Sequence, residues 1–341
     1  MILKIRGWLL LLLVLSTMHV LAQDPVAVEG TDSTYVLRHF LRNDIRIFYG
    51  FQANSVNYGS VNDGSPDWSG DLYKNFNDFI GVGITYKWLD GNLTFSLPGT
   101  TYLNQERSTL DKFTLGLNAT GRKFAFRGYL RDTKGVIATS PDPDFESAPS
   151  LHEFKIIAQV TTIFNEKKYS YRAALYQSEL QQKTSASWML RADIFYRQLG
   201  AKEQFLQPPY DNASRFADQV GLHYVGAPGV MVLPGYGANF SWKKGSLFLS
   251  PMIFGGAGVA FNSIKGDRGT FHKTNLEWNG SFLLNAGYNG NRMYCKIQSS
   301  VSIGYAKLDP AYLMTKDFDI IFLIGYRFRD MESWIPREPH P

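Results

Sequence analysis

The sequence predicts an all-β protein: a transmembrane, antiparallel, up-and-down β-barrel of about 14 strands, with 12 strands as the alternative. Three observations lead to this prediction. Apolar and polar residues alternate with a period of two from residue 45 to residue 328. Many of the alternating segments have about 9–12 residues, the length that a tilted strand needs to cross a bilayer. Short connections between these segments alternate with long ones, as they do in bacterial outer-membrane barrels.

The first 22 residues are predicted to form a cleaved signal peptide. Lys4 and Arg6 give a basic start, and residues 8–15 form an apolar core that is too short to span a bilayer. Val20-Leu21-Ala22 offers the small residues that a signal peptidase accepts, so the mature chain is expected to begin at Gln23. This leader predicts export to the bacterial outer membrane.

The rest of the chain is expected to form one barrel domain with two short flanking segments. Residues 23–44 are predicted to be a periplasmic N-terminal segment, residues 45–328 the barrel, and residues 329–341 a polar, proline-bearing periplasmic tail. The mature chain is nearly balanced in charge, because removing Lys4 and Arg6 from 35 basic residues leaves 33 against 30 acidic ones. This balance gives no argument for a nucleic-acid partner.

Thirteen strands can be read directly from the alternation. The first sets Ile45, Ile47 and Tyr49 on one face, and a hairpin at 82–97 repeats that pattern around a turn expected at Asp90-Gly91, a type I′ signal. The thirteen predicted strands are 44–53, the two halves of the hairpin at 82–97, 112–120, 123–131, 153–164, 168–177, 187–197, 235–242, 246–259, 275–288, 292–305 and 318–328.

An even number of strands keeps both termini on one side of the membrane. A less regular segment at 219–225 restores parity at fourteen, with 199–215 as a long periplasmic connection. Twelve strands result if one pair lies outside the wall. The short turns, expected at 90–91, 121–122, 165–167, 243–245 and 289–291, are predicted to be periplasmic. The long loops, expected at 54–78, 98–110, 132–152, 260–274 and 306–317, are predicted to face outside.

The apolar face is predicted to point outward into lipid. Aromatic residues gather near strand ends, where girdles at the lipid–water boundary would form. These residues are Tyr86, Trp88, Trp188, Tyr196, Trp242, Tyr288, Tyr305 and Tyr326. A closed sheet also removes the unpaired edges that lipid does not tolerate. The competing interpretation is a soluble periplasmic β-rich binding protein, in which the same face would cover a core.

The opposite face carries charged residues that would look into the lumen. The candidates are Lys112, Arg172, Arg191, Asp193, Glu277, Lys296, Asp319 and Arg327. Such charges can line an aqueous path and select small solutes. Alternatively, opposite charges pair across the lumen and fill it. A small-solute channel and a structural or assembly component of the envelope are therefore both open. The expected partners are outer-membrane lipid, the barrel-assembly machinery and small solutes.

No catalytic, metal or cofactor site is predicted. A lipid-acting hydrolase is the enzymatic alternative, with His152 or His223 as its base, but no serine has a G-x-S-x-G elbow. The only cysteine, Cys295, shares an apolar face with Met293 and Ile297 and is expected to act as a small hydrophobe.

Residues 169–196 resemble a Bacteroidota family catalogued as domain of unknown function 4421. The similar features are Tyr171-Arg172-Ala173-Ala174, followed by Gln177, Glu179, Lys183 and Ser187. Residues 31–36 (TDSTYV), residues 81–89 (GVGITYKWL) and the turn Gly121-Arg122-Lys123 resemble other recurring blocks of that family. The resemblance implies an outer-membrane β-barrel with a signal peptide, and it implies no activity.

Overall fold

The computed structural model describes residues 25–62, 65–100, 102–103, 106–107, 111–137, 150–201, 223–266, 269–307 and 311–329. The predicted signal peptide and residues 330–341 of the predicted C-terminal tail lie outside these ranges, so the structure leaves both predictions open.

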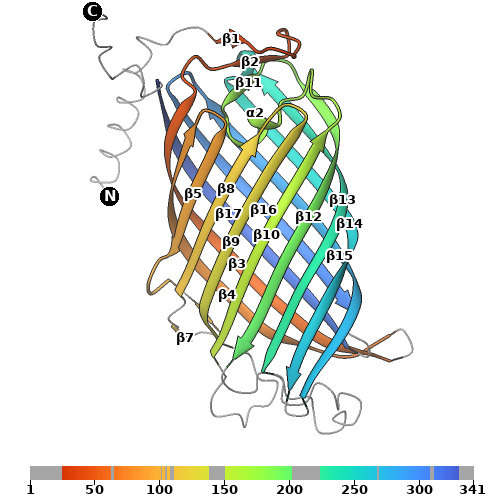
Figure 1. The fold of residues 1–341 in the computed structure, drawn as a ribbon. Coiled ribbons are helices and arrows are strands. Elements are labelled where there is room, and N and C mark those ends of the chain that lie inside the picture. The colour runs from red at the N-terminus through yellow and green to blue at the C-terminus, as the bar shows by residue number, and fades with distance from the viewer. Residues whose placement is uncertain are drawn as a thin grey trace, which may run out of the picture.

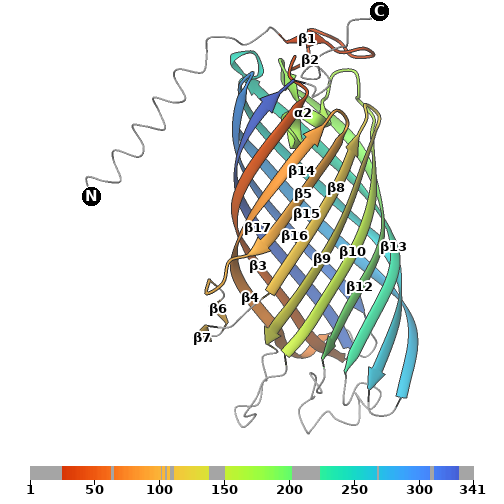
Figure 2. The same ribbon diagram turned by 60° about the vertical axis from the view of Figure 1, so that its left-hand side comes forward.

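Twelve strands form a closed antiparallel barrel (Figures 1 and 2). They are β3 (Asn43–Asn62), β4 (Ser65–Tyr86), β5 (Leu89–Ser96), β8 (Asp111–Thr120), β9 (Phe124–Ile137), β10 (Ser150–Ile163), β12 (Ser185–Ala201), β13 (Tyr224–Trp242), β14 (Leu247–Gly266), β15 (Gly269–Asn289), β16 (Met293–Lys307) and β17 (Ala311–Phe328). Each pairs with the next in this series, and β17 pairs with β3 to close the wall. A two-rung hairpin of β6 (Tyr102–Leu103) and β7 (Glu106–Arg107) is attached to β4.

The barrel fold is confirmed with 12 strands, and the preferred number of 14 is wrong. The predicted seventh strand, residues 168–177, instead contains the helix α2 (Tyr171–Leu175). Ser170 caps it: its side chain accepts a hydrogen bond from the backbone N–H of Ala173. The cap pairs a free backbone N–H of the first helical turn. The alternation of apolar and polar residues gives no sign of such a cap. The extra segment at 219–225 contributes only Tyr224–Val225, the start of β13; His223 is described but lies outside the strand, and residues 219–222 are outside the described residues.

The turn of the first hairpin is also displaced from its predicted place. The chain turns at Lys87-Trp88, where Lys87 has a φ of 58°. Asp90 belongs to β5 and pairs with Thr85 across the ladder. Its carboxylate is buried against Arg46 and Asn118, so tertiary contacts override the local turn signal of Asp90-Gly91.

The two ends of the barrel differ in their connections. At one end, here called the turn end, lie Asn43, Phe328 and the tight turns at 87–88, 121–123, 243–246 and 290–292. At the other, the loop end, much of what was predicted as loop is strand. β3 continues to Asn62 and β4 begins at Ser65, so most of the expected loop 54–78 is a paired ladder. The expected loops 260–274 and 306–317 are likewise largely strand. The sequence predicts a connection on the turn side at 199–215, but residues 199–201 belong to β12 at the loop end, and residues 202–222 are outside the described ranges.

The wall has an apolar outer face and a polar inner face. Along β4, Ile80, Val82 and Ile84 are exposed outside, while Asn77 and Thr85 are buried inside. Aromatic side chains lie at two levels on the outer face. Trp188 and Tyr196 sit eight residues apart on β12, and Tyr288 and Trp278 sit ten residues apart on β15. This spacing matches the roughly 9–11 residues with which a tilted strand crosses a bilayer.

A small second sheet covers the turn end (Figure 1). It consists of β1 (Val26–Ala27), β2 (Val36–Arg38) and β11 (Glu179–Gln181), in that order. The 3₁₀ turn η3 (Lys243–Gly245) joins β13 to β14 beside it. The N-terminal segment is therefore tied to the connection between β10 and β12. Of the helices in the described ranges, none has the length and apolar character needed to span a membrane.

Candidate functional site

The connection between β10 and β12 enters the barrel at the turn end. Residues 164–184, here called the plug, carry α2 and β11, and α2 lies within the ring of strands (Figures 1 and 2). Leu175, at the end of α2, is buried together with Met189, Leu233 and Met252, which face inward from three strands of the wall. Burying a side chain of this size contributes about 1.5–3 kcal/mol, so the apolar contact holds the plug in place.

Glu179 is the main ionic anchor of the plug. Its side chain is 1% exposed and accepts two hydrogen bonds from Arg122 of the β8–β9 turn, at 3.2 and 3.0 Å. The Ser170 hydroxyl donates a third at 2.6 Å, and Arg172 Nε lies 3.8 Å away. A two-point contact with one guanidinium is the arrangement that best compensates the charge of a buried carboxylate.

Two cations of the wall hold the backbone of the plug beyond α2. Lys296 Nζ donates to the carbonyl of Leu175 at 2.5 Å. The Arg327 guanidinium donates to the carbonyl of Gln177, and to Asn289 Oδ1 at 2.6 Å. Both cations are at least nine-tenths buried. Side chains of distant strands therefore attach the plug to the wall, whereas its ladder between β11 and β2 joins it to the N-terminal segment.

The N-terminal segment closes over the plug. The backbone N–H of Asp32 donates to the carbonyl of Lys167 at 2.9 Å. His39 is 1% exposed, and its Nε2 lies 3.1 Å from Asn289 Oδ1. Burial lowers the pKa of the His39 imidazole well below its ordinary value, and the nearby Arg327 charge lowers the pKa further. His39 thus joins the N-terminal segment to Asn289 as a neutral ring.

The blocks that carry the family resemblance meet at this plug. The block 169–187 forms most of it, residues 31–36 cover it, and Arg122 of the turn block binds Glu179. The backbone carbonyl of Lys87, from the block 81–89, accepts a hydrogen bond from Arg172 at 3.3 Å. Four stretches far apart in the sequence therefore build one structural feature.

Beyond the plug, the inner wall is lined by charged residues, most of them in pairs. Arg191 Nε lies 3.1 Å from Asp193 Oδ1, and Gln159 donates to the same carboxylate at 3.1 Å. Arg197 is paired with Glu277. Further toward the loop end the pairs are Lys155 with Glu153 at 2.6 Å and Arg131 with Asp317 at 3.6 Å. These paired side chains narrow the lumen, and cavities remain beside them.

The structure places seven of the eight candidate charges on the inner face of the wall. Lys112 donates to Gln52 Oε1, and Asp319 accepts from Ser300 at 3.0 Å. The other five are Arg191, Asp193, Glu277, Lys296 and Arg327. Arg172 is different: it lies on α2 rather than on a strand, and it contacts Ser178 and the Glu179 carboxylate.

Several inner charges were missed in the sequence. Arg46, Arg127, Arg131, Lys155 and Asp317 all occupy inward positions. The signal that could have found them is the alternation itself, because Arg46 stands between the outward residues Ile45 and Ile47. The anchoring role of Glu179 has no such signal, since it depends on a turn 57 residues away.

The residues considered for a hydrolase lie at the loop end. His152 contacts Asp132 on the neighbouring strand, and the backbone carbonyl of His223 accepts from Ala201 at 2.9 Å. Cys295 is exposed on the outer face, where its predicted apolar neighbour Ile297 also lies.

Several solved barrels resemble this structure at low sequence identity. The outer membrane protease OmpT from Escherichia coli has 8% identity and a TM-score of 0.35, with 86% of this chain and 100% of that chain covered. An outer membrane channel from Pseudomonas putida F1 has 10% identity and a TM-score of 0.36, with 84% and 96% covered. The translocator domain of the autotransporter NalP from Neisseria meningitidis has 14% identity and a TM-score of 0.35, with 88% and 91% covered. Scores at this level carry no conclusion about activity.

No curated protein matches the sequence. The family profile described as "Domain of unknown function (DUF4421)" matches residues 30–328. This match spans the covering segment, the plug and the whole barrel. The chain therefore belongs to the DUF4421 family.

Proposed function

We propose that this protein is an outer-membrane barrel that passes small solutes through a lumen closed at its periplasmic end by the plug. The observation that carries the proposal is the attachment of the plug. It is a separate segment held in a charged lumen by side chains such as Arg122, Lys296 and Arg327, and the wall is complete without it. Displacing it would leave the barrel intact and open a polar path.

The membrane location rests on the outer face. An apolar band lies between two levels of aromatic side chains. The short turns lie at the same end of the barrel as the first residue of β3 and the last residue of β17. In bacterial barrels that end is periplasmic. The plug and the N-terminal segment then face the periplasm, and the long strands of the loop end face outside. The role is non-enzymatic in this proposal.

The membrane location can be tested with two alanines on one strand. Ala192 lies midway between Trp188 and Tyr196 on the outer face of β12, whereas Ala186 precedes Trp188 at the turn end. Ala192→Arg should lower the free energy of unfolding from lipid vesicles by about 2–4 kcal/mol, because arginine is most costly at the bilayer midplane. Ala186→Arg is the matched control and should cost about 0–1 kcal/mol. Equal, small effects would contradict a lipid-facing band.

The channel role can be tested by removing the plug. The intact protein should be silent or nearly so in planar lipid bilayers, whereas a variant in which a short Gly-Ser turn replaces residues 165–184 should show discrete conductance steps. Heat-modifiable electrophoretic mobility would check that the variant is still a folded barrel. Glu166→Gln, a change in the connection leading to α2 with no role in the anchors, is the control and should remain silent.

A structural role in the envelope is the second candidate. It is favoured by the ion pairs that narrow the lumen, such as Arg191–Asp193 and Lys155–Glu153. It predicts that the folded variant without the plug conducts no better than the intact protein. That outcome would reject the channel proposal.

A further inference from the structure

The lumen beside the plug combines apolar and charged inward residues. On one side, β10, β12, β13 and β14 each contribute an apolar residue, namely Ile157, Phe195, Met231 and Phe254, beside the charged pairs described above. The guanidiniums of Arg197 and Arg191 lie over the rings of Phe195 and Phe254, 4.7 and 4.8 Å from their centroids. On the other side, β3, β5, β8 and β9 present polar and basic residues such as Gln52, Asn92, Lys112 and Arg127. A lumen that offers apolar side chains close to basic ones suits a ligand that has an apolar body and a charged group.

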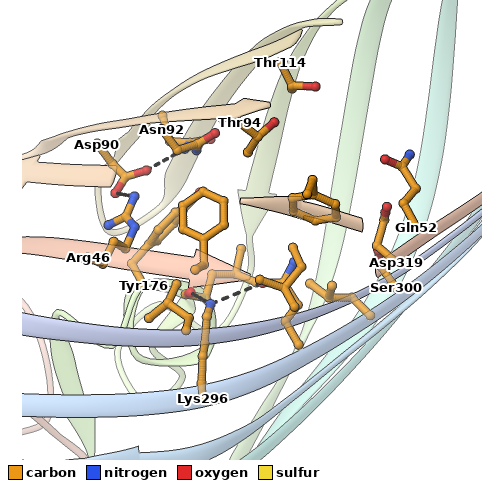
Figure 3. Close-up of a pocket in the computed structure, with 18 of the residues that line it drawn as sticks. Arg46, Gln52, Asp90, Asn92, Thr94, Thr114, Tyr176, Lys296, Ser300 and Asp319 are labelled. Carbon is orange, nitrogen blue, oxygen red and sulfur yellow. Dashed lines mark hydrogen bonds and ion pairs between the residues drawn. The ribbon is translucent and has the colours of Figure 1, made fainter. Parts of the chain in front are cut away.

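Two cavities lie in this region, with volumes of about 230 and 280 Å³. Leu175 of α2 lines both, so the plug forms their common floor. Figure 3 shows the first cavity. Asn92, Thr94 and Thr114 lie on one side of it, with Gln52, Ser300 and Asp319 across from them. Each volume is just below the ~300 Å³ at which small-molecule pockets begin, so a ligand would be small.

The first cavity carries an excess of positive charge. Its basic lining residues are Arg46, Lys112, Arg127, Arg131 and Lys296, and its carboxylates are Asp90 and Asp319. Arg46 is already paired with Asp90, and Arg131 with Asp317. Lys296 donates to a backbone carbonyl of the plug. Among the described residues, Arg127 is then the lining guanidinium without a carboxylate partner, and its charge favours an anion.

Arg127 is the cation best placed to receive that anion. It lines both cavities, and its side chain is exposed to the lumen. Its neighbours in register, Asn118 and Gln159, are occupied by hydrogen bonds to Asp90 and Asp193. Within the described ranges, the contact recorded for the Arg127 guanidinium is the ring of Tyr129, 5.9 Å from its centroid, and no carboxylate lies within ion-pair distance.

We infer that the lumen binds one small amphipathic organic anion, a carboxylate with an aliphatic or aromatic body. The carboxylate pairs with the Arg127 guanidinium, whose planar donors match it in a two-point contact. The apolar body lies against Ile157 and Met231, beside the rings of Phe195 and Phe254. This inference rests on the proposed passage of solutes and names their chemical class.

The inference is tested by equilibrium binding to the full-length protein in lipid nanodiscs, measured by titration calorimetry at low salt. Octanoate is the probe, and octan-1-ol and octylammonium have the same body without the negative charge. We expect saturable binding of octanoate to a single site and little binding of the other two. Arg127→Gln should weaken octanoate binding by about tenfold or more, because a charge-assisted contact is lost. Arg127→Lys should restore part of the affinity.

Two further variants separate this site from partition into lipid. Met231→Gln should weaken octanoate binding by making the apolar wall polar, whereas Lys123→Gln, at the exposed turn outside both cavities, should leave it unchanged. Absence of saturable octanoate binding would overturn the inference, and so would equal affinity in Arg127→Gln and the unaltered protein. Conductance without the plug but no octanoate binding would reject the ligand class and leave the channel proposal standing. Octanoate binding without conductance in the variant that lacks the plug would reject the channel proposal and leave the ligand class standing.

Discussion

Replacing Glu179 with glutamine is expected to release the plug while the barrel stays folded. The substitution keeps the size of the side chain and removes the charge that Arg122 and Arg172 share. Removing one partner of a buried ion pair costs about 3–5 kcal/mol, because the remaining charge is left without compensation. The substitution destabilises the contact of the plug with the barrel and leaves the hydrogen bonds between strands in place. The equilibrium constant for opening of the plug should therefore rise about a hundredfold or more.

Limited proteolysis would measure that release. Trypsin should cleave after Lys167, Lys168 or Lys183 in the Glu179→Gln variant far faster than in the unaltered protein, while the remaining barrel keeps its heat-modifiable mobility. Glu166→Gln removes a carboxylate from the same connection without touching the anchor, and it should leave the cleavage rate unchanged. The double variant Arg122→Gln, Glu179→Gln should be less easily opened than Glu179→Gln alone, because no arginine of the β8–β9 turn is then left unpaired. Equal cleavage of all four proteins would show that the apolar contacts of Leu175 hold the plug without Glu179.

The wall of the barrel could be predicted from the sequence because its cause is local. Lipid on one side and a polar interior on the other force a period of two on every crossing strand, and that period is visible without knowledge of the partner strand. The outward set Val82, Ile84 and Phe95 and the inward Asp193 and Lys296 follow from it directly. The strands β3, β4 and β15 also extend beyond their predicted ends, into stretches whose many polar residues resemble loop composition.

The plug could not be predicted because its contacts are remote. Residues 168–177 alternate well enough to resemble a strand, and only the Ser170 cap and the burial of Leu175 favour a helix. Similarly, Asp90-Gly91 carries a strong turn signal, but Asp90 is held inside by Arg46. Both errors share one physical origin: the contacts that Leu175 and Asp90 make with distant strands override the local preference of the backbone.

Replacing Arg327 with methionine is expected to loosen both the plug and the turn that follows β15. Arg327 is 2% exposed, and its guanidinium donates to the carbonyls of Gly290 and Gln177 and to Asn289 Oδ1. It also lies over the ring of Tyr294, 4.5 Å from the centroid. Methionine fills much of the volume but donates nothing, so the carbonyls of Gly290 and Gln177 lose this donor and Asn289 Oδ1 keeps only its contact with His39. Since a buried unsatisfied group costs about 1–3 kcal/mol, the free energy of unfolding should fall by about 3 kcal/mol or more.

Urea unfolding from lipid vesicles, followed by tryptophan fluorescence, would measure this loss. Arg329→Met is the matched control, because Arg329 is exposed two residues further along the chain and its recorded contact is the ring of Phe40 at 5.5 Å. That variant should change the free energy of unfolding by less than about 0.5 kcal/mol. Arg327→Lys should fall between the two, since one ammonium group cannot reach all three acceptors of a planar guanidinium. If Arg327→Met were as stable as Arg329→Met, the last strand would not anchor the plug, and Glu179 and Lys296 would have to hold it without help from Arg327.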